Sequence, residues 1–148
     1  MFINVREVEE RDFPQLVALF QEFAKFEKVP ERMINSVEKM LREKDLFHCF
    51  VAENAANEIV GYVTYFFGYY TWVGKSLYMD DLYVRPQYRG QGLGTRLIER
   101  VITLGKAAEC YKLRWQVSAW NKPAIEFYRR LGAEIDGTEQ NCDLIFNK

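Results

Sequence analysis

Residues 83–95 read Tyr-Val-Arg-Pro-Gln-Tyr-Arg-Gly-Gln-Gly-Leu-Gly-Thr and join an expected strand to the start of an expected helix. Gly90, Gly92 and Gly94 alternate along this turn, so several backbone N–H groups can converge at the helix N-terminus. Such groups, with the helix dipole behind them, form an anion site that suits a pyrophosphate. Glycine in a helix costs about 1 kcal/mol relative to alanine, so three around a first turn indicate a function. A plain tight turn explains the glycine count alone equally well.

Two common phosphate-binding motifs do not fit this turn. A dinucleotide fingerprint would need a third glycine where Thr95 or Leu97 stands, and a P-loop would need Gly-Lys followed by Ser or Thr. The remaining pattern is Arg-x-x-Gly-x-Gly over residues 89–94, with Arg85 and Arg96 as further positive charges nearby.

Hydrophobic periodicity on either side of the turn predicts a mixed α/β protein. The expected strands are 2–8, 47–52, 59–67, 76–84 and 112–119, with short closing strands within 133–146. The expected helices are one capped by Asp12 with Gln15 at the capping-box position, one over 36–42, one over 93–108, and one from Pro123 to a terminating Gly132. No linker or repeat divides the chain, so residues 1–148 are expected to form a single domain.

The composition excludes several classes of function. The 148 residues carry 20 Lys and Arg against 21 Asp and Glu, and this balance disfavours a nucleic-acid partner, because phosphate binding requires a cationic surface. The single histidine, His48, excludes metal centres built on several imidazoles and is interpreted as structural. The three cysteines show no close pairing, so neither a zinc site nor a disulfide framework is expected. No apolar segment suits a membrane span or a signal peptide, and a cytoplasmic protein is therefore expected.

In this context the glycine turn resembles the coenzyme A pyrophosphate loop of the GNAT acetyltransferase superfamily. The similarity extends through most of the chain and is greatest to the diamine (spermidine/spermine-type) N-acetyltransferases. Its other motifs are Ala24-Lys25-Phe26-Glu27, Phe47-His48-Cys49-Phe50-Val51-Ala52-Glu53, Trp72-Val73-Gly74-Lys75, Asp80-Asp81-Leu82-Tyr83-Val84 and Trp120-Asn121-Lys122-Pro123-Ala124-Ile125-Glu126-Phe127-Tyr128. The resemblance implies the GNAT fold, in which helices flank a mostly antiparallel sheet whose strands are splayed at the cofactor cleft.

The resemblance also implies an activity and its parts. Acetyl would pass from acetyl-CoA to a primary amine of a small polyamine or diamine, without a metal or a covalent acyl-enzyme, in a homodimer. The residues implied to bind the cofactor are Leu82, Tyr83, Val84, Arg89, Gly90, Gln91, Gly92, Leu93, Gly94, Thr95, Asn121, Lys122, Pro123, Ala124 and Tyr128. Two departures from the family pattern, Asp80 in place of Glu and Phe26 in place of Tyr, bear on the substrate more than on the reaction.

An amine acceptor needs a base, because an alkyl ammonium has a pKa near 10.4 and exposing its lone pair at pH 7 costs about 4.6 kcal/mol. The resemblance assigns this role to Asp80, and a relay through water is expected because Asp is shorter than Glu. Side chains alternate between the faces of a strand, so only one of Asp80 and Asp81 should face a given cleft. An exposed strand end would explain both acids without any catalytic role.

Three further residues receive implied roles, each with a simpler alternative. Tyr128 would give its proton to the leaving thiolate, and core packing is the alternative. Asn121 would bond the pantetheine amides, or it only caps its helix. Phe26 and Glu27 would line the amine site, with Glu27 attracting the substrate cation, or Glu27 lies at a frayed helix end.

Two other functions stay open beside a polyamine acceptor. One is acetylation of another amine, such as a lysine analogue, an amino-sugar or a protein amine. The other is a non-catalytic module that only binds acetyl-CoA, for which neither Tyr128 nor Asp80 would be needed.

Overall fold

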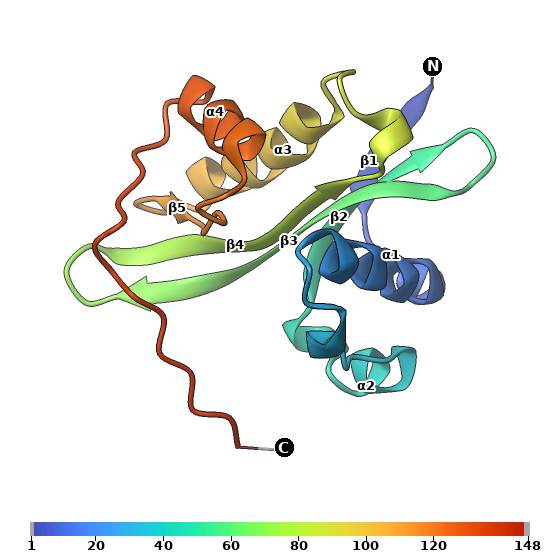
Figure 1. The fold of residues 1–148 in the computed structure, drawn as a ribbon, viewed down its shortest axis with the longest axis horizontal. Helices are drawn as coiled ribbons and strands as arrows, with labels where there is room; N and C mark the ends of the chain where they lie inside the picture. Colours follow the sequence, from blue (N-terminus) through green and yellow to red (C-terminus); the bar gives the residue numbers. More distant parts are fainter. Residues whose placement is uncertain (1, 147–148) are drawn as a thin grey trace. The chain divides into compact units, whose positions relative to one another are not determined.

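The computed structural model describes residues 2–146 and divides the chain into two compact units (Figure 1). The first unit ends at Trp115, and the second begins at Gln116. The first unit contains the sheet together with the glycine turn.

Five strands form the sheet of the first unit, in the order β1-β2-β3-β4-β5. Neighbouring strands are antiparallel except β4 and β5, which are parallel. The strands are β1 (Ile3–Glu7), β2 (His48–Asn54), β3 (Ile59–Tyr70), β4 (Gly74–Val84) and β5 (Leu113–Arg114). This mixed, mostly antiparallel sheet confirms the fold class expected from the sequence.

The ladder between β4 and β5 is short. It joins only Leu77 to Leu113 and Tyr78 to Arg114. Within the described residues, no strand pairs with residues 79–84 of β4 on that edge. A strand edge without a partner presents backbone N–H and C=O groups, so this stretch of β4 can offer them to an extended ligand.

Helices cover both faces of this sheet. The helices of the first unit are η1 (Glu10–Asp12), α1 (Phe13–Phe26), η2 (Pro30–Arg32), α2 (Val37–Arg42), η3 (Lys44–Leu46), η4 (Pro86–Tyr88) and α3 (Leu93–Ala107). Figure 1 shows α1 and α3 on opposite faces. Side chains alternate along β2, so this strand contributes to both faces of the sheet. Cys49 and Val51 belong to the core cluster on the α1 side. On the other side, the Phe50 ring lies 4.5 Å from the Arg100 guanidinium of α3.

The start of α1 differs from the expectation, because the Asp12 side chain makes no cap hydrogen bond to the helix. Both carboxylate oxygens of buried Asp12 instead accept hydrogen bonds from the Arg6 guanidinium at 2.8 Å. Arg6 also pairs with Glu53 of β2 at 3.2 Å. Gln15 likewise turns away from the capping box, and its side-chain oxygen accepts from the Ile59 N–H at 2.8 Å. These polar groups therefore join α1 to the sheet.

The second unit contains α4 (Lys122–Arg130), which begins and ends as expected. The Asn121 side chain accepts a hydrogen bond from the Ala124 N–H at 3.3 Å. At the other end Gly132 has φ +90°, and the Ala133 N–H donates to the Tyr128 carbonyl at 3.1 Å, which is the Schellman arrangement.

Two strand expectations near the C-terminus are wrong. The strand expected over 112–119 covers only Leu113–Arg114, because its ladder with β4 ends after two residue pairs. The closing strands expected within 133–146 are absent from the described residues. Six of those fourteen residues are acidic or amide side chains and one is Gly137, all poor strand formers.

Candidate active site

The glycine turn lies between β4 and α3 and owes its shape to two left-handed residues. Gly90 has φ +77° and Gly92 has φ +78°, a region that L side chains rarely adopt. A Cβ atom at either position would meet nothing within 4 Å, so glycine is needed here for backbone conformation and not for space. Gly92 is also the N-cap of α3, and no side chain caps that helix end. The first-turn N–H groups of α3, including that of Gly94, can therefore bind an anion.

Arg89 fixes the turn against α1. Its Nε donates a hydrogen bond to the Val84 carbonyl at 2.7 Å. Its guanidinium lies 5.1 Å from the ring of Phe26 and 5.5 Å from the ring of Tyr83. Phe26 therefore supports the glycine turn, and it is not among the residues that line the cleft described below.

The other two arginines near the turn also bind protein groups. Arg85 Nε pairs with the Glu22 carboxylate at 3.1 Å. Arg96 Nη2 donates to the Ile3 carbonyl at 3.0 Å. The positive charge expected around the turn is thus held in place by neighbouring elements of the first unit.

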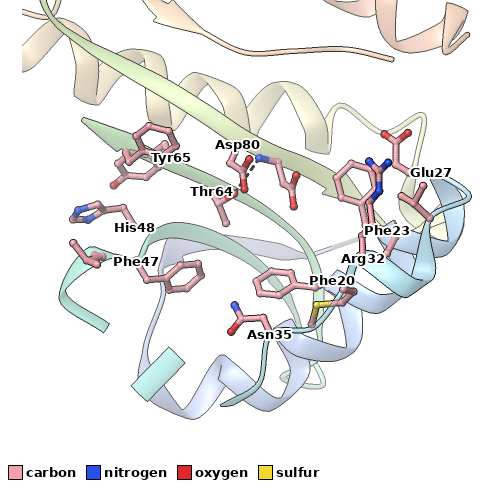
Figure 2. A pocket seen from close by; sticks show the side chains of 16 residues that line it. Phe20, Phe23, Glu27, Arg32, Asn35, Phe47, His48, Thr64, Tyr65 and Asp80 are labelled. Atoms are coloured by element: carbon pink, nitrogen blue, oxygen red, sulfur yellow. Dashed lines mark hydrogen bonds between the residues drawn. The ribbon is translucent and has the colours of Figure 1, made fainter. Parts of the chain in front are cut away.

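A cleft of about 450 Å³ opens beside the middle of β3 and β4 (Figure 2). Its walls come from α1, the segment after α1, the start of β2, and both central strands. The lining residues are Phe20, Phe23, Ala24, Glu27, Val29, Arg32, Met33, Asn35, Leu46, Phe47, His48, Thr64, Tyr65, Phe66, Asp80 and Asp81. Glu27 and Asp80, two residues expected at the amine site, are therefore brought together in one cleft.

A β-bulge places two acids in this cleft. Thr64 of β3 pairs with Asp81, but the next residue, Tyr65, pairs with Met79, so Asp80 is an extra residue in β4. A bulge interrupts the alternation of side chains, and both Asp80 and Asp81 line the cleft. The expectation that only one of the two acids faces it is therefore wrong. The Asp81 N–H donates to Thr64 Oγ1 at 3.0 Å, which fixes the backbone at the bulge.

The two acids have different environments. Burial and, to a lesser extent, the nearby charge of Asp80 together raise the pKa of Asp81 to about 7, against a smaller, opposing effect of the hydrogen bond from Tyr62. The Tyr62 phenol is buried in the core and donates a hydrogen bond to Asp81 Oδ2 at 3.3 Å. Asp80 remains exposed at the mouth, although partial desolvation by the cleft walls raises its pKa as well. Asp81 can therefore hold a proton near neutral pH.

Asp81 is the site residue that the sequence pattern does not single out. The signal that the sequence does carry is a pair of acids within the apolar strand 76–84. Regular alternation along a strand predicts that these two acids face opposite sides of the sheet. The bulge interrupts this alternation, and the residue types in the strand do not predict it. His48 is expected to be structural, and its ring stacks on Tyr65 with 5.6 Å between the ring centroids. The side chain also borders the cleft.

The backbone positions expected to bind the cofactor's arm lie at the end of β4. Leu82, Tyr83 and Val84 pair with β3 on one side, and their other side belongs to the edge left open beyond β5. Tyr83 and Val84 are buried, so these residues can offer backbone groups but little side-chain surface.

The remaining expected site residues lie in the second unit, on or beside α4. Tyr128 is the buried residue of this helix. Asn121 caps the helix through Ala124, which is the simpler of its two expected roles. The cofactor roles of Asn121, Lys122, Pro123, Ala124 and Tyr128 stay predictions.

Two features of residues 2–146 bear on other classes of site. No cluster of three or more His, Cys, Asp or Glu side chains there is arranged to hold a metal ion. None of the helices there combines the length and apolarity that crossing a membrane requires.

Comparison with known proteins gives a consistent family. The model of the Acetyltransferase (GNAT) family matches residues 5–133. A thialysine N-epsilon-acetyltransferase of Bos taurus is 38% identical over 144 residues, covering 90% of this chain and 85% of the relative. The spermidine/spermine N(1)-acetyltransferase-like protein 1 of Homo sapiens is 29% identical, covering 99% of this chain but 23% of that protein.

Solved structures agree on the fold. An aminoglycoside acetyltransferase from an uncultured soil metagenomic sample, solved with trehalose, superposes with a TM-score of 0.81 at 23% identity, covering 97% of each chain. These matches confirm the resemblance that the sequence motifs indicated.

Proposed function

We propose that this chain, which belongs to the GNAT acetyltransferase family and is an acetyl-CoA-dependent N-acetyltransferase, acetylates a small diamine-like molecule at a primary amine. The observation that carries the proposal is the cleft in which Glu27, Asp80 and Asp81 gather beside the central strands. Three carboxylates attract an ammonium group, and two of them lie at the β-bulge of β4.

The first unit offers groups that fit acetyl-CoA. The uncapped N-terminus of α3, with left-handed Gly90 and Gly92 before it, suits a diphosphate. The open edge of β4 at residues 82–84 suits the amides of the pantetheine arm, and one N–H there would stabilise negative charge on the thioester oxygen. Acetyl-CoA supplies the thioester carbon that the amine attacks, and coenzyme A leaves as a thiol.

Proton removal from the amine falls to the Asp80–Asp81 pair. Transfer from an ammonium of pKa near 10.4 to an ordinary carboxylate of pKa 3.9 is uphill by about 8.8 kcal/mol, because each pKa unit corresponds to about 1.36 kcal/mol. With the pKa of Asp81 at about 7, the cost falls to about 4.6 kcal/mol. Asp80, exposed at the mouth, receives the proton through water and passes it to Asp81.

Tyr128 is the proposed donor of a proton to the coenzyme A sulfur. A phenol of pKa near 10 can protonate a thiolate of pKa near 8.5 as that thiolate forms. Asn121 to Ala124, at the start of the same helix, complete the proposed cofactor contacts. Transfer is direct, from acetyl-CoA to the bound amine.

Thiol release provides the test of this function. Purified protein is mixed with acetyl-CoA and, separately, with diamines, lysine analogues, amino-sugars and an amine-bearing peptide, and free coenzyme A is measured with a thiol reagent. Release that depends on a diamine-like acceptor supports the proposal. Release with a peptide or an amino-sugar alone would replace the acceptor class, and release with none of them would refute the function.

Assembly and location complete the proposal. A homodimer is supported by the β3–β4 hairpin, whose large apolar side chains include Phe66, Phe67, Tyr69 and Trp72, the last 96% exposed. Light scattering of the pure protein tests the dimer.

The protein is proposed to work in the cytoplasm, as one domain over residues 1–148, without nucleic-acid or membrane partners. Limited proteolysis tests the single domain, since a single domain would resist cleavage near residue 116.

A further inference from the structure

One side chain of β3 binds the peptide unit that joins the two acids of the cleft. The Asp81 N–H belongs to the peptide between Asp80 and Asp81, and it donates to Thr64 Oγ1 at 3.0 Å (Figure 2). In a β-bulge the extra residue lies outside the regular ladder, so backbone groups there need other partners. The Thr64 hydroxyl supplies one at the point where the register between β3 and β4 shifts.

The same strand holds Asp81 at two points. Tyr62 donates to its carboxylate Oδ2 at 3.3 Å, and Thr64 accepts from its backbone N–H. Tyr62 and Thr64 are two residues apart along β3, so their side chains lie on one face of the sheet. Both side chains are buried, and a β-branched threonine has few χ1 rotamers, so its hydroxyl keeps a fixed direction. β3 therefore fixes both the side chain and the backbone of Asp81.

The hydrogen bond to Thr64 also bears on Asp80. A peptide unit is planar, so the direction of the Asp81 N–H sets the direction of the Asp80 carbonyl and restricts the dihedral angles on either side. Those angles decide where the Cβ atoms of the two acids point. Both acids line the cleft because the bulge interrupts alternation, whereas regular pairing would turn one of them to the other face.

We propose that Thr64 is a positioning residue of the proton relay, whose hydroxyl holds the Asp80–Asp81 peptide so that both carboxylates stay in the cleft. This inference rests on the proposed function. The role requires no contact between Thr64 and the amine or the cofactor. Valine has the shape of threonine but cannot accept a hydrogen bond, whereas serine keeps the hydroxyl and loses only the methyl group. Thr64→Val should therefore release the peptide, and Thr64→Ser should retain it.

Steady-state thiol release with a diamine measures the effect at several pH values. Thr64→Val should lower kcat about 10- to 100-fold, less than loss of the base itself. KM should change less, because Glu27 and the cleft walls remain. The acidic limb of kcat/KM should move to lower pH, because the charge of Asp80, which helps to raise the pKa of Asp81, moves away. Thr64→Ser should recover most of the rate and the original limb.

The other titratable or charged groups around the two acids stay in place in Thr64→Val, so a shift of the limb reports on the acids themselves. These groups are Glu27, Arg32, His48 and Tyr65, which line the cleft, and Tyr62, which is hydrogen-bonded to Asp81.

A double-mutant cycle with Asp80→Asn tests whether Thr64 acts through the relay. Both substitutions disrupt the same pair of acids, so the combined variant should lose much less rate than the product of the two single losses. Losses that simply multiply would show that Thr64 acts independently of Asp80, and they would overturn the proposal.

Two variants on α3 control for structural effects. Thr103→Val removes an exposed hydroxyl and should leave both stability and the pH profile unchanged. Val101→Ala leaves a cavity at a fully buried residue, so it should lower the free energy of unfolding without moving the acidic limb. The same limb shift in Val101→Ala, or an unchanged limb with full turnover in Thr64→Val, would overturn the proposal. Thr64→Ala, which also lacks the hydroxyl, serves the same measurements where Thr64→Val fails to fold.

Nuclear magnetic resonance titration of isotope-labelled aspartate separates failure of this proposal from failure of the proposed function. In the unaltered protein the titrations of Asp80 and Asp81 should be coupled, and in Thr64→Val the coupling should be lost. Loss of coupling in a protein that turns over no amine supports the positioning role and refutes the proposed reaction. Diamine turnover that is identical in Thr64→Val and the unaltered protein refutes the positioning role and leaves the reaction standing.

Discussion

The Tyr62 phenol donates a hydrogen bond to Asp81 Oδ2 at 3.3 Å, joining the apolar core to the floor of the cleft. Burial raises the pKa of Tyr62 well above its usual value, so the phenol stays protonated and acts as a donor. This hydrogen bond favours the charged form of Asp81 and opposes the burial that raises its pKa. The balance of these two effects, together with the nearby charge of Asp80, sets the pH at which Asp81 accepts a proton.

The first prediction concerns this balance. A base must be unprotonated to act, so kcat/KM should fall as the pH decreases below about 7, the pKa of Asp81. Asp81→Asn should lower kcat/KM by about 10²- to 10³-fold and remove that acidic limb. Tyr62→Phe removes the donor and should shift the limb to higher pH. Rate profiles between about pH 5.5 and pH 9.5 measure both effects.

Asp80→Asn separates the two acids. The charge of Asp80 helps to raise the pKa of Asp81, so its removal should move the acidic limb to lower pH while the rate decreases. A shift to higher pH would instead identify Asp80 as the final proton acceptor. Tyr111→Phe, at an exposed residue that lines neither the cleft nor the hairpin, serves as the control and should leave the profile unchanged.

The second prediction concerns Tyr128. Tyr128→Phe keeps the ring but removes the acidic proton, and kcat should fall about 10²- to 10⁴-fold. Coenzyme A affinity should change little, because the ring still packs. Stopped-flow turnover and calorimetry measure the two quantities, with Tyr111→Phe, at a residue 68% exposed, as the control. Undiminished turnover of a folded Tyr128→Phe protein would remove the proton-donor role.

The third prediction concerns the glycine turn. Ala at position 92 must hold φ near +78°, which costs an L residue about 1–2 kcal/mol. Gly92→Ala should therefore lower the free energy of unfolding by about that amount and weaken coenzyme A binding, since relaxation of the turn moves the N–H groups of α3. Gly137→Ala is the matched control, because that glycine has no left-handed φ and open space around it. Equal coenzyme A affinities in the two variants would contradict the anion site.

The fourth prediction concerns acid stability. Burial alone would raise the pKa of Asp12, but hydrogen bonds from Arg6 and the Glu9 N–H outweigh it, and the pKa lies below its ordinary value of 3.8. The folded state thus gains stability from this group above pH 3.8 and loses it as the pH falls through the lowered pKa.

Asp12→Asn should lower the free energy of unfolding at pH 7 by about 3 kcal/mol, because it leaves a largely buried Arg6 without its main partner. Urea denaturation at several pH values measures the difference, which should shrink below the pKa of Asp12. The control variant is Glu10→Gln. Glu10 is exposed, and its carboxylate lies 3.7 Å from the Lys44 ammonium, so the free energy of unfolding should fall by less than about 1 kcal/mol. A similar loss from both variants would rule out a special contribution of the Arg6–Asp12 pair.

Local sequence signals predicted most of the fold because they act within a few residues. The Lys39 N–H donates a hydrogen bond to Ser36 Oγ at 3.1 Å, so Ser36 caps α2. This agrees with the helix start expected at residue 36. Gly132 ends α4 because a left-handed residue is needed there. The hairpin between β2 and β3 follows from the turn at residues 54–58, where Asn54 Oδ1 accepts hydrogen bonds from two backbone N–H groups.

What the sequence did not predict depends on partners far along the chain. The position of Asp12 predicts a helix cap, yet its carboxylate binds the guanidinium of Arg6, six residues earlier. Arg6 in turn pairs with Glu53 on another strand. The bulge at Asp80 depends on how β3 and β4 pair, and no residue type in either strand records it. The family resemblance named Asp80 and Glu27, but only the folded cleft adds Asp81 and Arg32 to them.

The short helix η2 that carries Arg32 lies outside the sheet, whereas the aspartates are built into a strand register. Exchanging residues on such a peripheral turn disturbs no ladder hydrogen bond. Substitutions at a few positions between residues 28 and 35 could therefore change the acceptor during evolution. Asp80 and Asp81, which handle the proton, would stay in place. Selectivity and reactivity would evolve here at separate rates.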